Sequence, residues 1–159
     1  MKAIAIIPAR MNASRFPGKP LAKLHGMPMI GHCYLRTQMC EDLVDTYVAT
    51  CDSEIFDYIE SIEGKVIMTS KDHERASDRT AEAMLKIEKK NKEKVDVVVM
   101  VQGDEPMVTA KMISESIKPF KTDKSIKVAN LVASMGSIEE FEDPNEIKVV
   151  IDKNNDALY

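Results

Sequence analysis

The sequence has no long apolar run. None approaches the roughly 20 residues that a membrane-spanning helix needs, so we expect no membrane partner. The apolar stretch at residues 3–7 is too short for a usual signal peptide and is better interpreted as a first β-strand. We therefore expect a cytoplasmic protein.

Patterns typical of disulfide frameworks and metal sites are also lacking. The chain has only three cysteines, and an odd number at wide spacing argues against a disulfide framework or a zinc site. The three histidines do not have the spacing of metal ligands. We interpret the cysteines as ordinary buried or half-buried thiols and the histidines as structural residues. They are Cys33, Cys40, Cys51, His25, His32 and His73.

Acidic residues are absent from residues 1–40, although the whole chain has a net charge of −4. This segment holds six Lys and Arg residues, while all 26 Asp and Glu residues lie in the remainder. A basic segment on an acidic protein predicts a local anionic ligand. A nucleic-acid partner is not expected, because the remaining surface would repel a phosphate backbone.

Two familiar phosphate-binding motifs are missing. Gly18-Lys19 is followed by Pro20 instead of Ser or Thr, and residue 13 is Ala instead of Gly, which excludes a Walker A loop. No Gly-x-Gly-x-x-Gly occurs, which excludes the usual dinucleotide fingerprint. Any phosphate site must be built in another way.

What the sequence does have is an alternation of strand and helix patterns. Its 159 residues, 44% of them hydrophobic, predict one packed domain over residues 1–159. We expect strands near 3–7, 46–50, 65–68, 95–101, 126–134 and 146–151, helices near 29–41, 52–64, 77–94 and 109–119, and a loop or short helix near 137–145. This order predicts an α/β fold with an open, mostly parallel sheet and helices on both faces.

The loop at residues 8–21 follows the first strand, where ligands bind in open parallel sheets. It carries three cations and one hydroxyl, at Arg10, Arg15, Lys19 and Ser14. Its small residues let backbone N–H groups approach a ligand, so the loop has the parts of a polyphosphate cradle. A solvated basic loop would not need Pro17, Gly18 and Pro20 to fix its path, and we favour the cradle.

A second candidate segment, Gln102-Gly103-Asp104-Glu105-Pro106, follows the apolar strand at 95–101. A carboxylate at this place, opposite a polyphosphate loop, is well placed to hold Mg²⁺. We therefore expect Asp104 to be a metal ligand, and Gln102 to reach a hydroxylated substrate. The same residues also favour a turn between a strand and a helix. The metal assignment therefore depends on the position of this segment opposite the first loop.

Several of these segments resemble one known family. They are Ile7-Pro8-Ala9-Arg10, Ala13-Ser14-Arg15-Phe16-Pro17-Gly18-Lys19-Pro20-Leu21 and Val101-Gln102-Gly103-Asp104-Glu105-Pro106, with later blocks at residues 48–50, 69–73, 143–150 and 157–159. Together they resemble the 3-deoxy-manno-octulosonate cytidylyltransferases, also called CMP-KDO synthetases. The resemblance runs through the whole chain in the same order.

The resemblance implies a Rossmann-like fold of the nucleotidyltransferase type and transfer of CMP from CTP to 3-deoxy-manno-octulosonate (KDO). Pyrophosphate is released, Mg²⁺ is the cofactor, and the product serves lipopolysaccharide or other surface-glycan synthesis. The family continues past the position of Tyr159. We therefore expect this chain to lack a C-terminal portion that resembles the source of a second metal-binding aspartate, much of the sugar pocket and the contacts of a homodimer.

The resemblance also implies roles for individual residues. Arg10, Arg15 and Lys19 would hold the phosphates, and Ala9, Ala13 and Ser14 would offer backbone or hydroxyl contacts. Asp104 would bind the metal, Gln102 would contact the sugar acid, and Ser77 and Arg79 would belong to the cytidine side. The expected catalytic residues are Arg10, Lys19 and Asp104.

One block departs from the family. Members usually have Asp-His-x-Ser-Gly-Thr-Asp/Glu-Arg, whereas residues 72–79 place Arg75 and Ala76 where the family has Ser and Gly. This changes both the charge and the allowed backbone angles. Two alternatives therefore stay open: a cytidylyltransferase for another 3-deoxy sugar acid, such as an amino-KDO or a nonulosonic acid, and a CTP-binding module without turnover.

Overall fold

The computed structural model describes residues 1–12 and 16–159, so Ala13, Ser14 and Arg15 lie outside the described residues. The chain forms two compact units, Met1–Ala129 and Asn130–Tyr159. No helix in the described ranges is both long and apolar enough to cross a membrane.

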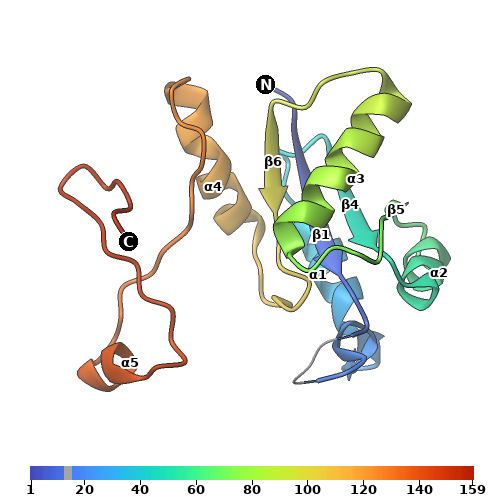
Figure 1. Ribbon diagram of the computed structural model, residues 1–159, viewed down its shortest axis with the longest axis horizontal. Helices are drawn as coiled ribbons and strands as arrows, with labels where there is room; N and C mark the ends of the chain where they lie inside the picture. The colour runs from blue at the N-terminus through green and yellow to red at the C-terminus, as the bar shows by residue number, and fades with distance from the viewer. Residues whose placement is uncertain (13–15) are drawn as a thin grey trace. The chain divides into compact units, whose positions relative to one another are not determined.

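Unit 1 is built on a parallel four-stranded sheet (Figure 1). Its strands, in spatial order, are β5 (Val66–Met68), β4 (Asp45–Thr50), β1 (Ala3–Ala9) and β6 (Val97–Met100). Neighbouring strands pair in parallel throughout, with Ile4 opposite Asp45 on one side and Val98 on the other. The predicted open parallel α/β sheet is confirmed.

Four α-helices connect or follow these strands. They are α1 (Met29–Gln38), α2 (Ser53–Ser61), α3 (Ala76–Asn91) and α4 (Ala110–Thr122). Between β1 and α1 the chain forms a 3-10 turn, η1 (Lys19–Leu21), and a small hairpin of β2 (Lys23–Leu24) and β3 (Met27–Pro28). The long segment after β1 is therefore partly structured.

Strand β1 is buried at every residue because both of its faces are covered. Successive side chains in a strand point to opposite faces. Ala5 and Ile7 pack with α1, α2 and α4, whereas Ile4 and Ile6 pack with α3. Figure 1 shows α3 in front of the sheet. The prediction of helices on both faces is confirmed.

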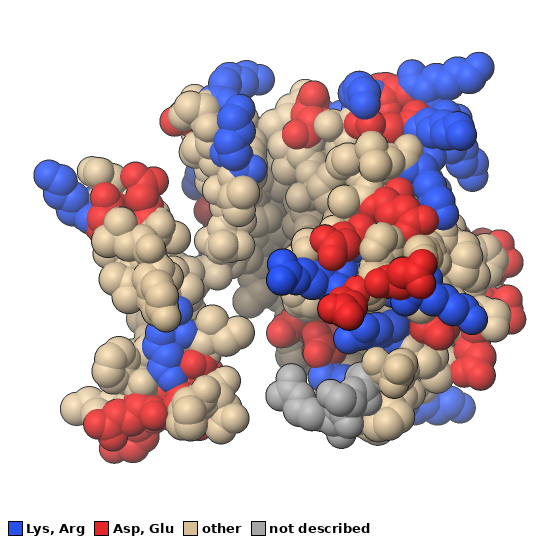
Figure 2. Space-filling model, viewed as in Figure 1, with Lys and Arg blue, Asp and Glu red and all other residues tan. Residues whose placement is uncertain are grey.

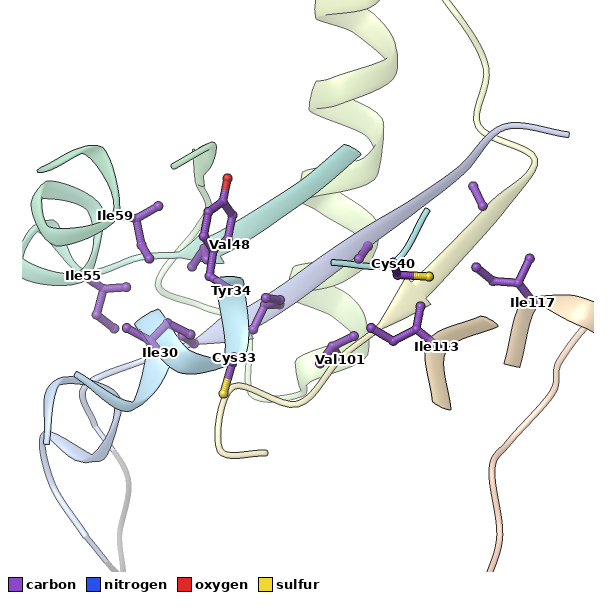
Figure 3. Packing of buried hydrophobic residues seen from close by; sticks show 14 of the residues in the cluster. Ile30, Cys33, Tyr34, Cys40, Val48, Ile55, Ile59, Val101, Ile113 and Ile117 are labelled. Atoms are coloured by element: carbon purple, nitrogen blue, oxygen red, sulfur yellow. The ribbon is translucent and has the colours of Figure 1, made fainter. Parts of the chain in front are cut away.

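The larger core cluster lies on the face covered by three helices (Figure 3). Its helical members are Ile30, Cys33 and Tyr34 of α1, Ile55 and Ile59 of α2, and Ile113 and Ile117 of α4. Full burial of one such side chain stabilises the fold by about 1.5–3 kcal/mol relative to leaving it exposed. This cluster supports the strand ends that carry the candidate site.

The helix boundaries differ from the predicted ranges by a few residues. Helix α4 begins as expected after Thr109, whose Oγ1 accepts a hydrogen bond from the N–H of Met112 at 3.2 Å, but it continues past Pro119 to Thr122. A proline removes one backbone donor, and here the helix tolerates that loss near its end. Helix α3 begins at Ala76, after the N-cap Arg75, slightly before the predicted range of 77–94, and it ends at Asn91.

The C-terminal half of α3 carries a charged face that is exposed to solvent. Lys89, Lys90 and Lys92 are exposed, and the exposed Glu93 follows them in the sequence. On the other face of α3, Ala83 and Ile87 are buried, while Leu85 is 57% exposed.

Unit 2 contradicts two predicted strands. Residues 126–134, which begin at the end of unit 1, and residues 146–151 form no strand, and a single bridge joins Ile151 to Ala157. Their apolar side chains are exposed, including Val128 at 77% and Ile147 at 90%. β-branched runs form strands where a neighbouring strand pairs with them. Neither run has such a neighbour among the described residues. The short helix α5 (Ile138–Glu142), capped by Ser137, does form near the expected place.

Candidate functional site

The candidate site lies where the strand order reverses. From β1 the chain proceeds through β4 to β5 on one side of β1, and then returns to place β6 on the other side. The carboxyl ends of β1 and β6 are therefore neighbours at a topological switch point. Open α/β sheets bind their ligands in the crevice at this kind of position.

A cavity of about 280 Å³ opens at this point. Four segments line it: the end of β1 with Arg10, the start of η1, the residues leading into α3, and the turn after β6. Its lining residues are Pro8, Ala9, Arg10, Lys19, Pro20, His73, Glu74, Arg75, Ala76, Arg79, Gln102, Gly103 and Asp104.

The loop after β1 is closed at its neck by backbone hydrogen bonds. The N–H of Gly18 donates to the carbonyl of Met11 at 2.9 Å, and the N–H of Met11 donates to Asp52 Oδ2 at 2.9 Å. Gly18 has φ of +74°, a left-handed conformation that glycine adopts without steric cost. This neck delivers Lys19 to the cavity in a fixed position.

An ion pair joins the two segments that the sequence singled out. Lys19 Nζ lies 2.7 Å from Asp104 Oδ2, and the two side chains are 35% and 48% exposed. Both groups line the cavity. A cation from the first loop and a carboxylate from the end of β6 therefore meet at the site.

Gly103 makes this meeting possible. A Cβ at Gly103 would lie 2.9 Å from the backbone oxygen of Pro8, closer than real Cβ contacts come. Only the absence of a side chain lets the turn after β6 approach the end of β1 this closely. Beneath the turn, burial raises the pKa of the Cys33 thiol to about 11, so this thiol is protonated at neutral pH and is a packing residue.

Arg79 is the most deeply buried cation of the cavity wall, at 3% exposure. Its Nη1 donates to Thr69 Oγ1 at 2.5 Å and to the carbonyl of Ser70 at 3.2 Å. Its Nη2 has no hydrogen-bond partner among the described residues. A buried donor without a partner costs free energy, which a ligand acceptor in the cavity would recover.

A second network holds the same wall from behind. Glu82 Oε2 accepts hydrogen bonds from the N–H of Ser70 at 2.9 Å and from His73 Nε2 at 2.5 Å, and Oε1 pairs with Lys86 Nζ at 2.7 Å. The bond from Lys86, followed by that from the Ser70 N–H, lowers the pKa of Glu82 to about 2. Glu82 is therefore ionised at neutral pH.

Most of the predicted site residues come together here. Those that line the cavity are Ala9, Arg10, Lys19, Arg79, Gln102 and Asp104. Ser77 is exposed in the first turn of α3 and does not line the cavity. Ala13, Ser14 and Arg15, which were also predicted to belong to the site, lie outside the described residues.

Three further residues with polar or charged side chains line the cavity, namely His73 and Glu74, which the sequence did not assign to the site, and Arg75, which it singled out only as a departure from the family. His73 was assigned a structural role, yet it both contacts Glu82 and lines the cavity. A signal was present, because residues 69–75 directly follow β5, and residues after parallel strands gather at one edge of the sheet. Applying this rule to every strand would have found them.

The charges of the cavity favour an anionic ligand. Four cations line it, Arg10, Lys19, Arg75 and Arg79, against the carboxylates of Glu74 and Asp104. Figure 2 shows positive and negative side chains interleaved on the face of unit 1 toward the viewer. The cavity thus concentrates positive charge on a surface that is otherwise mixed.

The same cavity suits a magnesium ion that is held by one carboxylate together with the phosphates of a ligand. Among the described residues, no group of three or more His, Cys, Asp or Glu side chains is arranged to hold a metal ion. Mg²⁺, however, is usually bound by one or two carboxylates together with ligand phosphates and water. The exposed carboxylate of Asp104, facing cations that attract a polyphosphate, fits that donor set.

Comparisons with known proteins point to one family. A family model described as Cytidylyltransferase matches residues 4–159. The 3-deoxy-manno-octulosonate cytidylyltransferase of Geobacter metallireducens is 42% identical over 159 residues, which are 100% of this chain and 60% of that protein. The enzyme of the same name from Escherichia coli is 37% identical over 158 residues, covering 99% of this chain and 61% of that protein.

A solved structure agrees with these relatives. The structure of CMP:2-keto-3-deoxy-manno-octonic acid synthetase complexed with CTP superposes with a TM-score of 0.90 at 36% identity, covering 100% of this chain and 63% of that one. A 4-diphosphocytidyl-2C-methyl-D-erythritol synthase, 14% identical with a TM-score of 0.60, shares the fold. This chain spans about 60% of the length of the curated relatives that it matches.

Proposed function

This chain belongs to the cytidylyltransferase family, and from that membership we propose that it transfers CMP from CTP to KDO with release of pyrophosphate. One observation carries the proposal. At the switch point of the sheet, a cavity brings Arg10 and Lys19 opposite Asp104, which is the arrangement that a nucleoside triphosphate with a divalent cation requires.

The phosphate half of the site comes from the loop after β1. Arg10, Arg15 and Lys19 bind the phosphate oxygens, and Ala9, Ala13 and Ser14 supply backbone or hydroxyl contacts. Hydrogen bonds from a cation to a phosphate are about twice as strong as neutral ones. Support comes from Arg10 and Lys19, which line the cavity.

Asp104 would hold Mg²⁺, which when bound supplies positive charge to the phosphate oxygens. Lys19 then exchanges its contact with Asp104 for one with the triphosphate. Because both side chains of this pair are partly exposed, its separation costs little. Arg10, Lys19 and Asp104 are the proposed catalytic residues.

The reaction is a direct substitution at phosphorus. The anomeric hydroxyl of the sugar acid attacks the α-phosphorus of CTP, a new phosphorus–oxygen bond forms, and the bond to the β-phosphate bridge breaks. Pyrophosphate carries away the displaced electron pair, and the hydroxyl proton is released. Arg10 and Lys19 stabilise the charge that develops on the phosphate oxygens. Gln102 contacts the sugar acid from the turn after β6.

The cytidine side lies at the beginning of α3. Arg79 places a free Nη2 donor in the cavity wall, which suits the oxygen acceptors of a cytosine or ribose. Ser77 lies two residues earlier, at the exposed start of the helix. We assign the reaction to the cytoplasm, in the synthesis of lipopolysaccharide or another surface glycan, by a homodimer.

A second sugar acid is a specific alternative. Arg75 lines the cavity and, among the described residues, has no side-chain hydrogen bond or ion pair. This cation changes the charge of the cavity wall where the family has Ser, which keeps open another 3-deoxy sugar acid, such as an amino-KDO or a nonulosonic acid. A third candidate is a module that binds CTP without turnover, which the cavity would also support.

Pyrophosphate release tests these functions. We expect release only when CTP, Mg²⁺ and KDO are present together. Turnover with another sugar acid and none with KDO would show that the assigned substrate is wrong. A preference for UTP or ATP would contradict the cytidine assignment. Calorimetric binding of CTP without any turnover would support the binding module.

A further inference from the structure

Residues 69–75, between β5 and α3, form one wall of the cavity. This segment contributes His73, Glu74 and Arg75 to the lining. It is not a strand or helix, so its position depends on the side chains that fix it to α3. Those side chains are Arg79, described above, and Glu82.

The carboxylate of Glu82 determines the protonation state of one ring nitrogen of His73. An ionised carboxylate can only accept hydrogen bonds, so His73 Nε2, which lies 2.5 Å from Glu82 Oε2, must carry a proton. In the neutral ring Nδ1 is then an acceptor. No hydrogen bond to Nδ1 is formed by the described residues. His73 therefore has one ring nitrogen engaged and one available.

We propose that Glu82 is a positioning residue of this cavity, which fixes His73 in the Nε2–H tautomer so that Nδ1 accepts a hydrogen bond from a ligand hydroxyl or amine. The ring lines the cavity and is 24% exposed, so a ligand can reach it. The same oxygen of Glu82 also holds the N–H of Ser70, which keeps the whole segment against α3. This proposal rests on the proposed function, because the ligand used to test it is CTP.

Glu88 provides a matched control on the same helix. Its carboxylate also accepts from a lysine and a backbone N–H, namely Lys94 Nζ at 2.7 Å and the N–H of Val95 at 3.0 Å. The segment that it holds does not line the cavity. A substitution at Glu88 therefore removes comparable hydrogen bonds from α3 without disturbing a segment that lines the cavity.

The first experiment compares CTP binding by calorimetry, with Mg²⁺ present, for the full chain and its Glu82→Gln and Glu88→Gln variants. We expect binding about tenfold weaker for Glu82→Gln, the effect of one misplaced hydrogen bond, and unchanged binding for Glu88→Gln. His73→Phe, which keeps a ring without nitrogens, should weaken binding by a similar factor. Equal affinities for the wild type, Glu82→Gln and His73→Phe would overturn the proposal.

The second experiment reads the tautomer directly. The chain has only three histidines, so nitrogen chemical shifts of their rings can be assigned one by one. We expect His73 to be Nε2-protonated in the wild type and in Glu88→Gln, and a tautomer mixture in Glu82→Gln. His32, whose Nε2 lies 2.9 Å from the carbonyl of Leu24, is the internal reference. An unchanged His73 signal in Glu82→Gln would contradict the positioning role. A wild type that does not bind CTP would contradict the proposed function, while the tautomer would still test Glu82.

Discussion

Lys19 Nζ lies 2.7 Å from Asp104 Oδ2, and this contact joins residues 85 positions apart in the sequence. An ion pair this exposed stabilises a fold by only about 0–1 kcal/mol. Its importance is therefore geometric: it shows that the first loop and the turn after β6 present opposite charges to one cavity. The pair can open when a polyphosphate and a divalent cation compete for its members.

Replacing Lys19 tests the phosphate assignment. We expect Lys19→Ala to weaken CTP binding by roughly 10- to 100-fold, because a hydrogen bond to a charged group contributes about 1.5–3 kcal/mol. The unfolding free energy should change little. Calorimetry and urea denaturation measure the two effects. Lys23→Ala is the control, since Lys23 is exposed nearby and does not line the cavity. Equal CTP affinities for the two variants would make the loop merely a basic surface.

Replacing Asp104 tests the metal assignment. We expect Asp104→Asn to keep the fold and to lower Mg²⁺-dependent pyrophosphate release by about 100-fold or more, because a metal ion contributes several kcal/mol of charge stabilisation. Glu105→Gln, at the adjacent carboxylate that does not line the cavity, should retain activity. Turnover by Asp104→Asn at the wild-type rate would remove the assignment.

Gly103→Ala tests the close approach of β1 and the turn after β6. The new Cβ would lie 2.9 Å from the Pro8 oxygen, and backbone must move to relieve the overlap. We expect a loss of about 1–3 kcal/mol in unfolding free energy, measured by urea denaturation, and weaker CTP binding. Gly136→Ala serves as the comparison, because its nearest neighbour would be at 3.5 Å. The same small effect in both variants would show that the turn is not tightly constrained.

The pKa of Glu82 predicts a pH-dependent contribution to stability. Its folded value of about 2 lies below the ordinary 4.5, so the ionised form stabilises the folded state. This contribution is complete above pH 4.5 and is lost as the pH falls from there toward 2. The difference in unfolding free energy between the wild type and Glu82→Gln should therefore be largest near neutral pH and shrink in acid. Urea denaturation across this range measures it, and a difference independent of pH would contradict the assignment.

Local sequence patterns predicted much of the fold. The apolar, non-alternating run in β1 indicated a strand with both faces covered, and Thr109 marked the start of α4. These predictions succeeded because burial and helix capping depend on residues close together in the chain. The runs at 126–134 and 146–151 have the same β-branched composition but no pairing strand among the described residues, and the prediction failed there.

The sequence by itself determined the chemistry available to the site. It placed cations in the loop after the first strand and a carboxylate after the strand at 95–101, and of these groups Arg10, Lys19 and Asp104 line the cavity in the structure. The tertiary structure alone decided how they meet. The strand order placed β6 beside β1, which brought Asp104 into contact with Lys19. The packing of α3 placed Glu82 within hydrogen-bond distance of His73. Residue periodicity reports which face of an element is buried, but contacts between distant side chains depend on the order in which the strands assemble.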